Sequence, residues 1–361
     1  MEILPEQVDA DEVERTVPAD EEPYASGNPA INRFEPEERK YHGPLYTCVQ
    51  ILELIEQGRQ DEEDKVRLDE PVVRSELEYI GNRMQGISLH YYTCSGWEGS
   101  KGSATKFNTD QYYWALGKCL EIEEVIKKHK AIMDEKDPQN TIGLLVDEWG
   151  TWWDEEPGTI AGHLYQQNAL RDAFVASLSL NVFHKYTDRV KMANIAQIVN
   201  VLQSMILTDQ EGTGHMVLTP TYHVFEMYTP FQEATYLPVD LESEVMAVSK
   251  AYFKEKADAK DAGYRPCPML SASAAKTQDG SIVLAVTNVS LDKDQTIDFR
   301  IDGFTAKQVS GRILTSANVA DFNDFAHPAV VAPRDYKDAK LKNGVLTVKV
   351  PAKSIIVLNI K

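Results

Sequence analysis

Two carboxylates and two indole rings lie together in residues 146–152, VDEWGTW. The apolar run 142–146 predicts a strand buried on both faces, so the carboxylates come where such a strand meets its loop. A glutamate flanked by two tryptophans suits a sugar site, because indole faces stack on sugar rings while a carboxylate attacks or stabilises the anomeric carbon. Spacing alone leaves open an acidic strand end beside ordinary core aromatics.

Strands and helices alternate around this segment. The hydrophobic pattern predicts strands that are separated by helices at 108–133 and 164–183. The predicted strands are 86–92, 142–148 and 189–197. Strand, helix, strand, helix, strand is typical of a parallel sheet.

After about Leu237 the pattern changes to short strands with frequent turns, which indicates an antiparallel β-sandwich of about 120 residues. Turns are predicted at 278–280 and 342–344 from their Asp-Gly and Asn-Gly pairs. The clearest strands are 281–287, 345–350 and 354–360.

The net charge of −19 is concentrated near the N-terminus. Residues 1–70 hold 20 Asp/Glu against 7 Lys/Arg, or −13, and residues 71–361 hold 36 against 30, or −6. This acidity argues against nucleic acid or an anionic membrane as a partner. Residues 1–44, with six prolines among the acids, are expected to form a mobile or peripheral arm, and short helical patterns follow at 45–57 and 72–80.

The sequence contains no run of 18 apolar residues, so it predicts no membrane-spanning helix. Its first residues do not form a signal peptide, so we expect a cytoplasmic protein. No C-x-x-C spacing is present, so the cysteines predict reduced, mostly buried thiols. Four histidines also lack ligand spacing, and we expect no metal. The cysteines are Cys48, Cys94, Cys119 and Cys267, and the histidines are His163, His184, His215 and His223.

Four motifs occur in a set order. They are SLHYY at 88–92, VDEWGTW at 146–152, DRVKMANIAQ at 188–197 and LTPTYH at 218–223. Together they resemble the α-L-arabinofuranosidases of glycoside hydrolase family 51, over about residues 78–361. The resemblance implies a partial (β/α)8 barrel, with its sixth, seventh and eighth strands recognisable, followed by a β-sandwich.

Domain boundaries follow from this resemblance. Residues 1–77 form an acidic, Pro-rich segment without a recognisable fold. Residues 78–237 correspond to the C-terminal part of the catalytic barrel, and residues 238–361 to the β-sandwich.

The resemblance also implies roles for five residues. Glu148 is the nucleophile of a retaining enzyme and forms a covalent arabinosyl-enzyme. Tyr92 hydrogen-bonds near it, Trp152 packs on arabinose, Gln197 binds sugar hydroxyls, and His90 has a supporting role. Each of the four also has a structural alternative, such as a tryptophan of the hydrophobic shell or a satisfied core histidine.

The acid/base residue of the family has no counterpart. It is a glutamate that follows an asparagine, and the chain contains no Asn-Glu dipeptide. Asp147 is expected to point to the opposite strand face from Glu148 and to be structural. Residues 155–156 are expected in a solvated loop, and Trp97 either leans over the site or anchors its Gly/Ser-rich loop.

The function expected from these features is a retaining glycoside hydrolase of the EC 3.2.1.55 class. It would remove terminal non-reducing α-L-arabinofuranosyl residues from arabinose-containing polysaccharides or oligosaccharides, without a cofactor. The alternative is an inactive fragment or a carbohydrate-binding remnant of such an enzyme. Family members often form oligomers, so a homo-oligomer is a further expectation.

Overall fold

The computed structural model describes residues 73–74, 77–78, 84–209, 212–252 and 263–361. The chain divides into two compact units, one comprising 1–85 and 128–142, the other 86–127 and 143–361. The arm predicted at 1–44 and the helical pattern predicted at 45–57 lie outside the described residues.

In the first unit, residues 73–74 and 77–78 are helical, as the pattern at 72–80 predicts. An ion pair joins Arg74 Nη1 to Glu135 Oε1 at 3.0 Å. Both side chains are exposed, so this pair contributes little to stability.

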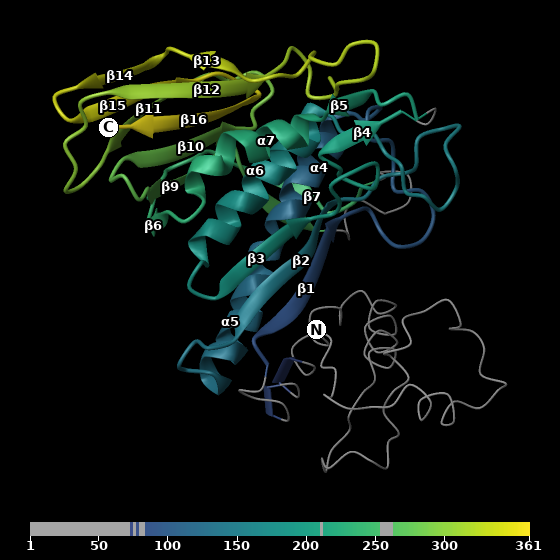
Figure 1. Cartoon of the computed structure of the whole chain (residues 1–361), viewed down its shortest axis with the longest axis horizontal. Coiled ribbons are helices and arrows are strands. Elements are labelled where there is room, and N and C mark those ends of the chain that lie inside the picture. Colours follow the sequence, from purple (N-terminus) through teal and green to yellow (C-terminus); the bar gives the residue numbers. More distant parts are fainter. Residues whose placement is uncertain (1–72, 75–76, 79–83, 210–211, 253–262) are drawn as a thin grey trace. The chain divides into compact units, whose positions relative to one another are not determined.

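The second unit begins with three parallel strands in the order β1-β2-β3, and helices connect them along the chain (Figure 1). These elements are β1 (Gly86–Thr93), α4 (Thr109–Leu120), α5 (Ile122–Lys136), β2 (Gly143–Thr151), α6 (Leu170–Lys185) and β3 (Val190–Ile195). Residues 128–136 of α5 are counted with the first unit. The predicted alternation of strands and helices is confirmed.

The helix predicted at 108–133 is divided at Glu121. The N–H of Glu121 bonds to the carbonyl of Lys118, three residues back, at 3.2 Å. Such a tight turn of the 3₁₀ type ends one helix and lets the next begin.

The helix predicted from Leu164 begins later, at Leu170. Leu164 has a φ of 54°, a left-handed conformation that a helix does not contain. Asp172 stabilises the actual start of α6, because its Oδ2 accepts the N–H of Ala169 at 2.7 Å.

The two faces of the parallel sheet differ in polarity. On β1, Ile87 and Leu89 are buried, whereas Ser88 and His90 are exposed. On β2, Trp149 is 1% exposed and packs against α6. One face is thus apolar and buried, and the other face is polar.

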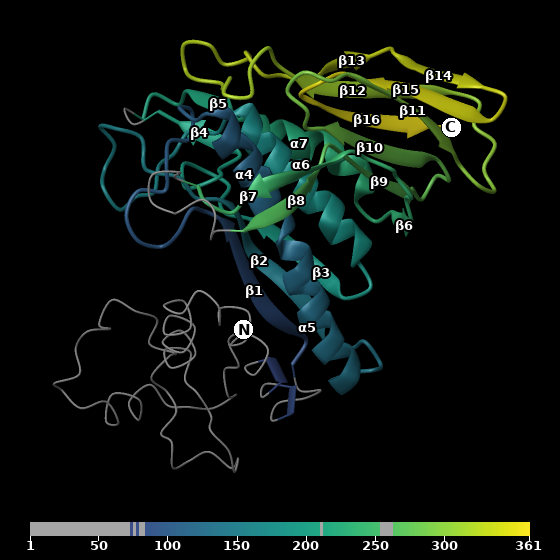
Figure 2. The ribbon, with the colours of Figure 1, turned by 180° about the vertical axis from the view of Figure 1, so that it is seen from behind.

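Two antiparallel sheets follow (Figure 2). Their strands are β6 (Thr235–Leu237), β9 (Leu270–Lys276), β10 (Ile282–Asn288), β11 (Gln295–Arg300), β12 (Val309–Thr315), β13 (Arg334–Tyr336), β14 (Ala339–Lys342), β15 (Val345–Val350) and β16 (Ser354–Ile360). The six-stranded sheet has the order β13-β12-β16-β10-β9-β6, and the three-stranded sheet the order β11-β15-β14. Leu284 and Leu358 of the first sheet and Leu346 of the second belong to one buried hydrophobic cluster.

The three strands predicted in this part of the chain are confirmed as β10, β15 and β16. The turn between β14 and β15 has left-handed backbone at both central residues, with φ 52° at Asn343 and 76° at Gly344. This is the hairpin turn that an Asn-Gly pair favours.

Shorter elements lie between or beside these sheets. They are β4 (Ile206–Thr208), β5 (Met216–Leu218), α7 (Pro220–Tyr228), the 3₁₀ turn η3 (Thr229–Phe231), β7 (Val245–Ser249) and β8 (Tyr264–Pro268). Thr219 caps α7 by accepting the N–H of Tyr222 at 3.3 Å, and Pro220 suits the first helical position.

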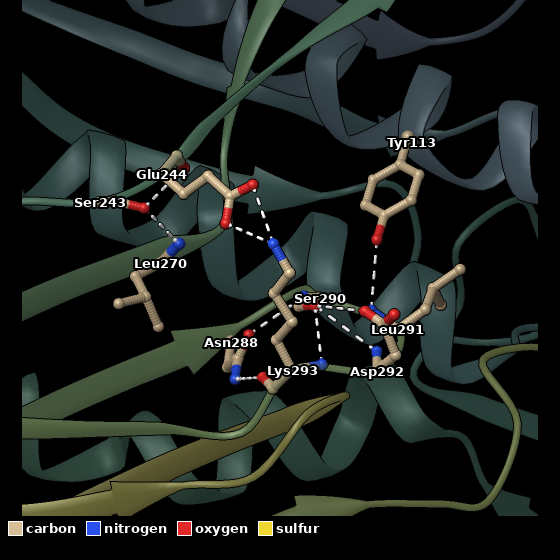
Figure 3. Close-up of polar contacts among 9 residues, drawn as sticks. All are labelled: Tyr113, Ser243, Glu244, Leu270, Asn288, Ser290, Leu291, Asp292 and Lys293. Atoms are coloured by element: carbon tan, nitrogen blue, oxygen red, sulfur yellow. Dashed lines mark hydrogen bonds and ion pairs between the residues drawn. The ribbon is translucent and has the colours of Figure 1, made fainter.

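The loop after β10 is bound to the α/β part of the same unit (Figure 3). The N–H of Leu291 donates to Tyr113 Oη of α4 at 3.2 Å. Lys293 Nζ lies 2.7 Å from Glu244 Oε2, and Asn288 Nδ2 donates to the carbonyl of Lys293 at 2.8 Å. The Tyr113 contact joins this loop to α4, the Glu244 contact joins it to the segment before β7, and the Asn288 contact holds the loop itself together.

Cys119 and Cys267 are buried thiols, as predicted, and burial raises the pKa of Cys267 to about 12. Cys48 lies outside the described residues. Within the described residues, no helix has the length and apolar character needed to cross a membrane.

His184 in the last turn of α6 predicts a pH dependence of stability. Its ring stacks on Phe231 at 4.5 Å, its Nδ1 lies 2.9 Å from Ser273 Oγ, and burial lowers its pKa to about 4. The unfolded chain binds this proton near pH 6.5. The contribution of the neutral His184 ring to the free energy of unfolding is therefore complete above pH 6.5. It is lost as the pH falls towards 4, by up to about 3 kcal/mol.

Urea unfolding at pH 7, 6, 5 and 4 checks this expectation. His184→Asn should show a smaller loss of unfolding free energy between pH 7 and 4 than the unchanged chain. The exposed His163 provides the control His163→Asn, which should keep the full loss. An unchanged pH dependence in His184→Asn would contradict the assignment.

Candidate active site

Glu148 and Tyr92 meet on the polar face of the parallel sheet, near the carboxyl ends of β2 and β1. Tyr92 Oη donates a hydrogen bond to Glu148 Oε2 at 2.8 Å. Burial first, and then the hydrogen bond to Glu148 and its charge, raise the pKa of Tyr92 well above its ordinary value. The phenol therefore keeps its proton at neutral pH, and it holds a carboxylate whose side chain is 44% exposed.

A β-bulge sets the direction of the two adjacent carboxylates. Ser88 pairs with Leu145 and His90 pairs with Glu148, so one residue of β1 faces two residues of β2. The extra residue interrupts the usual alternation of side chains between the two faces. Asp147 and Glu148 consequently lie on the same face.

The prediction that Asp147 points away from Glu148 is therefore wrong. Ser88 Oγ donates to Asp147 Oδ1 at 2.8 Å, and His90 Nε2 lies 3.3 Å from the same oxygen. The other ring nitrogen, His90 Nδ1, lies 3.4 Å from Glu148 Oε2. His90 is thus exposed between two carboxylates and is not a core histidine.

Aromatic side chains form a wall beside Glu148. The ring of Trp152 lies 5.1 Å from that of Tyr92 and 5.4 Å from that of Trp97, both edge to face. Trp97 is 41% exposed, and Lys101 Nζ lies 5.4 Å from the Trp152 ring. These rings offer the type of surface on which a sugar stacks.

Only one of the two tryptophans that flank Glu148 contributes to this wall. Trp149 is 1% exposed and packs at 5.2 Å from Phe183 and 6.1 Å from Phe225. The idea of a glutamate between two sugar-binding indoles is therefore wrong for Trp149.

Asp154 fixes the loop that carries Trp97. It accepts hydrogen bonds from Ser100 Oγ and, at 2.7 Å, from the N–H of Lys101. Gly102 in this loop has a φ of 90°, a conformation that favours glycine, and an added Cβ would lie 2.4 Å from Tyr252 Oη. The loop therefore holds Trp97 beside Trp152.

The segment after Glu148 rests on buried polar groups that the hydrophobic pattern does not indicate. Asp172 Oδ1 accepts from Thr151 Oγ1 at 2.7 Å and from Trp153 Nε1 at 2.8 Å. Gln203 Oε1 accepts the N–H of Thr151 at 2.7 Å. Asp172, Thr151 and Gln203 are fully buried, so each hydrogen bond is costly to lose.

Residues 155–156 also support the loop. Glu155 Oε1 accepts the N–H of Leu164 at 2.6 Å, and Glu156 Oε1 accepts that of Gln167 at 3.3 Å. Both carboxylates are partly buried and have a local structural task.

Gln197 follows β3 and is exposed. Its N–H donates to the carbonyl of Val201 at 3.0 Å. The preceding Ala196 packs in one hydrophobic cluster with Tyr92, and Trp152 packs against this cluster. Gln197 thus belongs to a segment that borders the aromatic wall, although no hydrogen bond joins its side chain to Glu148 within the described residues.

Parallel strands joined by helices, with a carboxylate and an aromatic wall near the strand ends, are typical of glycoside hydrolases. The family model of the α-L-arabinofuranosidase C-terminal domain matches residues 147–354, more than half of the chain. The chain therefore belongs to the α-L-arabinofuranosidases of glycoside hydrolase family 51, as the sequence motifs indicate.

Relatives with known names support this membership. An intracellular exo-α-L-arabinofuranosidase of Bacteroides ovatus is 57% identical over 282 residues, which are 78% of this chain and 52% of that protein. The crystal structure of the family 51 arabinofuranosidase from Xanthomonas axonopodis pv. citri is 36% identical with a TM-score of 0.74, and covers 85% of this chain and 63% of that one. This chain therefore spans about half the length of the Bacteroides relative.

A third comparison concerns the fold alone. The α-L-arabinofuranosidase from Thermotoga maritima, solved as an arabinose complex, is 21% identical with a TM-score of 0.64, and covers 81% of this chain and 55% of that one. The predicted fold class is thus confirmed at the level of an α/β part followed by an all-β part.

Proposed function

We propose that this chain carries the nucleophile site of a retaining α-L-arabinofuranosidase. The observation that supports this most is the Glu148 carboxylate, which is held by the Tyr92 hydroxyl beside the partly exposed Trp152. An oxygen of Glu148 attacks the anomeric carbon, the bond to the leaving oxygen breaks, and water then hydrolyses the arabinosyl ester.

The other site residues complete the binding of one sugar ring. Trp152 packs on the apolar face of arabinose. Gln197 hydrogen-bonds to sugar hydroxyls, and His90 supports the nucleophile through its Nδ1, which lies 3.4 Å from Glu148 Oε2.

The finer architecture is part of the same proposal. We assign β1, β2 and β3 to the sixth, seventh and eighth strands of a (β/α)8 barrel, and the two antiparallel sheets to a β-sandwich. The domain boundaries are then residues 1–77, 78–237 and 238–361. The parallel pairing of the three strands and the cluster shared by the two sheets support this assignment.

The substrates are terminal non-reducing α-L-arabinofuranosyl groups of arabinose-containing polysaccharides or oligosaccharides. The exo-α-L-arabinofuranosidase activity of the Bacteroides relative supports this substrate class, and its intracellular location supports a cytoplasmic location here. No cofactor is needed for the reaction. We also propose a homo-oligomer.

A panel of aryl glycosides tests the proposal directly. The chain should cleave 4-nitrophenyl α-L-arabinofuranoside and leave the α-L-arabinopyranoside, β-D-xyloside and β-D-glucoside largely intact. Cleavage of another glycoside with equal efficiency would contradict the assigned substrate.

One observation favours a second candidate, a carbohydrate-binding remnant without turnover. The chain has no Asn-Glu dipeptide, which is the context of the family's acid/base. Binding of arabino-oligosaccharide, measured by calorimetry, without hydrolysis of any arabinofuranoside would support this candidate over the enzyme.

Removal of the Tyr92 hydroxyl tests how Glu148 is held. Tyr92→Phe keeps the ring against Trp152 but loses the 2.8 Å hydrogen bond, so kcat on the aryl arabinofuranoside should fall about 10- to 100-fold. KM should change little. Tyr91→Phe is a control, because the Tyr91 hydroxyl donates to the carbonyl of Lys118 and not to the site. Equal rates for Tyr92→Phe and the unchanged chain would contradict the role.

A further inference from the structure

We propose that Asp147 is a positioning residue of the nucleophile site, which acts on Glu148 through the imidazole of His90. The inference rests on the proposed function of Glu148. It assigns a task to a carboxylate that the bulge in β2 brings onto the face of the site.

Asp147 is itself held in place. Ser88 Oγ donates to Asp147 Oδ1 at 2.8 Å, and His90 Nε2 lies 3.3 Å from that oxygen. Ser88, His90 and Tyr92 alternate along β1, so all three side chains point to the same face. A continuous chain of contacts thus runs from Ser88 through Asp147 and His90 to Glu148.

The position of the ring explains why Asp147 matters. His90 has a carboxylate oxygen next to each nitrogen, with Asp147 Oδ1 beside Nε2 and Glu148 Oε2 beside Nδ1. The charge of Asp147 on the Nε2 side therefore fixes how the ring lies beside Glu148.

The charged and polar groups that face His90 come from two strands. Asp147 and Glu148 face it from β2, and Tyr92 of β1 donates to the same Glu148 oxygen. In the described part of the chain, no lysine or arginine forms an ion pair with either carboxylate. Asp147 and Glu148 are thus the charged groups of the described residues that lie beside this ring.

The arrangement also selects the attacking oxygen. Tyr92 and His90 both approach Glu148 Oε2, so Oε1 is the oxygen that no described side chain holds. If Asp147 loses its charge, the Nε2 side of the ring loses its carboxylate neighbour and the ring is free to turn. The Glu148 carboxylate then loses one of its two anchors, and turnover falls while sugar binding by the aromatic wall remains.

Asp147→Asn is the variant that tests this proposal, because it keeps the size of the side chain and removes the charge. On the aryl arabinofuranoside, kcat should fall about 10-fold and KM should stay within about 2-fold. Ser88→Ala, which leaves the charge but frees the carboxylate, should give a smaller loss of kcat. Asp240→Asn, at an exposed aspartate outside the site, should behave as the unchanged chain.

Nitrogen-15 NMR of the histidine rings supplies a readout that is independent of turnover. His90→Asn identifies the His90 resonances. At one fixed pH, the shift of His90 Nδ1, the nitrogen that faces Glu148, should differ between the unchanged chain and Asp147→Asn. The same pattern in both proteins, or an unchanged kcat in a folded Asp147→Asn, would overturn the proposal.

The two measurements separate this proposal from the proposed function. If the unchanged chain cleaves no aryl arabinofuranoside, the proposed function fails, and the His90 resonances alone decide on Asp147. If Asp147→Asn does not fold, Ser88→Ala takes its place, with a smaller change in the His90 Nδ1 shift as the expected result and no change as the contrary one.

Discussion

Replacement of Glu148 by glutamine is expected to lower the turnover of 4-nitrophenyl α-L-arabinofuranoside at least about 10⁴-fold, because an amide does not form the covalent arabinosyl intermediate. The substitution is nearly isosteric, and its amide oxygen can still accept the Tyr92 hydrogen bond. The loss should therefore appear in kcat, while the melting temperature stays close to that of the unchanged chain.

Two further variants sharpen this experiment. Glu98→Gln removes an exposed carboxylate from the Trp97 loop and should retain activity. In Glu148→Ala, azide fits in place of the missing carboxylate, and it should restore cleavage of the activated substrate with a β-L-arabinofuranosyl azide as the product. Normal turnover in Glu148→Gln would exclude Glu148 as the nucleophile.

The second large effect concerns the leaving group. The chain contains no Asn-Glu dipeptide, so its own residues supply no recognised general acid. A general acid contributes about 10²- to 10⁴-fold. For this chain we therefore compare kcat/KM on arabino-oligosaccharides with kcat/KM on an activated aryl arabinofuranoside. This ratio should be about 10²- to 10⁴-fold lower than in an enzyme that has the acid.

A series of aryl arabinofuranosides with leaving groups of graded acidity measures this directly. The logarithm of kcat/KM should fall steeply as the pKa of the leaving phenol rises, because the departing oxygen receives no proton. Arabinobiose should be a very poor substrate. A flat dependence, with rapid cleavage of arabinobiose, would show that an acid of this chain protonates the leaving group.

The fold was predictable where local pattern and topology agree. The run 142–146 and the strand 354–360 are apolar enough that their burial follows from composition, and the Asn343-Gly344 pair forms the hairpin turn that it favours. The division of the long helix at Glu121 was not predictable, because no glycine or proline lies within three residues of it.

The directions of the site residues were harder to predict. Regular alternation places Asp147 and Glu148 on opposite faces, and only the pairing of β2 with β1 creates the bulge that brings them together. The sequence does not show which of Trp149 and Trp152 is exposed, but in the structure α6 buries Trp149. Both outcomes depend on tertiary pairing.

Buried polar support was not predictable either. Asp172 holds Thr151 and Trp153 from the first turn of α6, and no spacing in the sequence distinguishes such a carboxylate from an exposed one. Its identification requires the three-dimensional neighbours of the segment that follows Glu148.

Trapping of the covalent intermediate is the most direct test of the central claim. The chain is incubated with an activated 2-deoxy-2-fluoro-α-L-arabinofuranoside, digested and analysed by mass spectrometry. One fluoroarabinosyl group should be found on the peptide that contains Glu148, attached through the Glu148 carboxylate and absent in Glu148→Gln. A label on another residue, or hydrolysis of the aryl arabinofuranoside with inversion at the anomeric carbon, would contradict Glu148 as the nucleophile of a retaining enzyme.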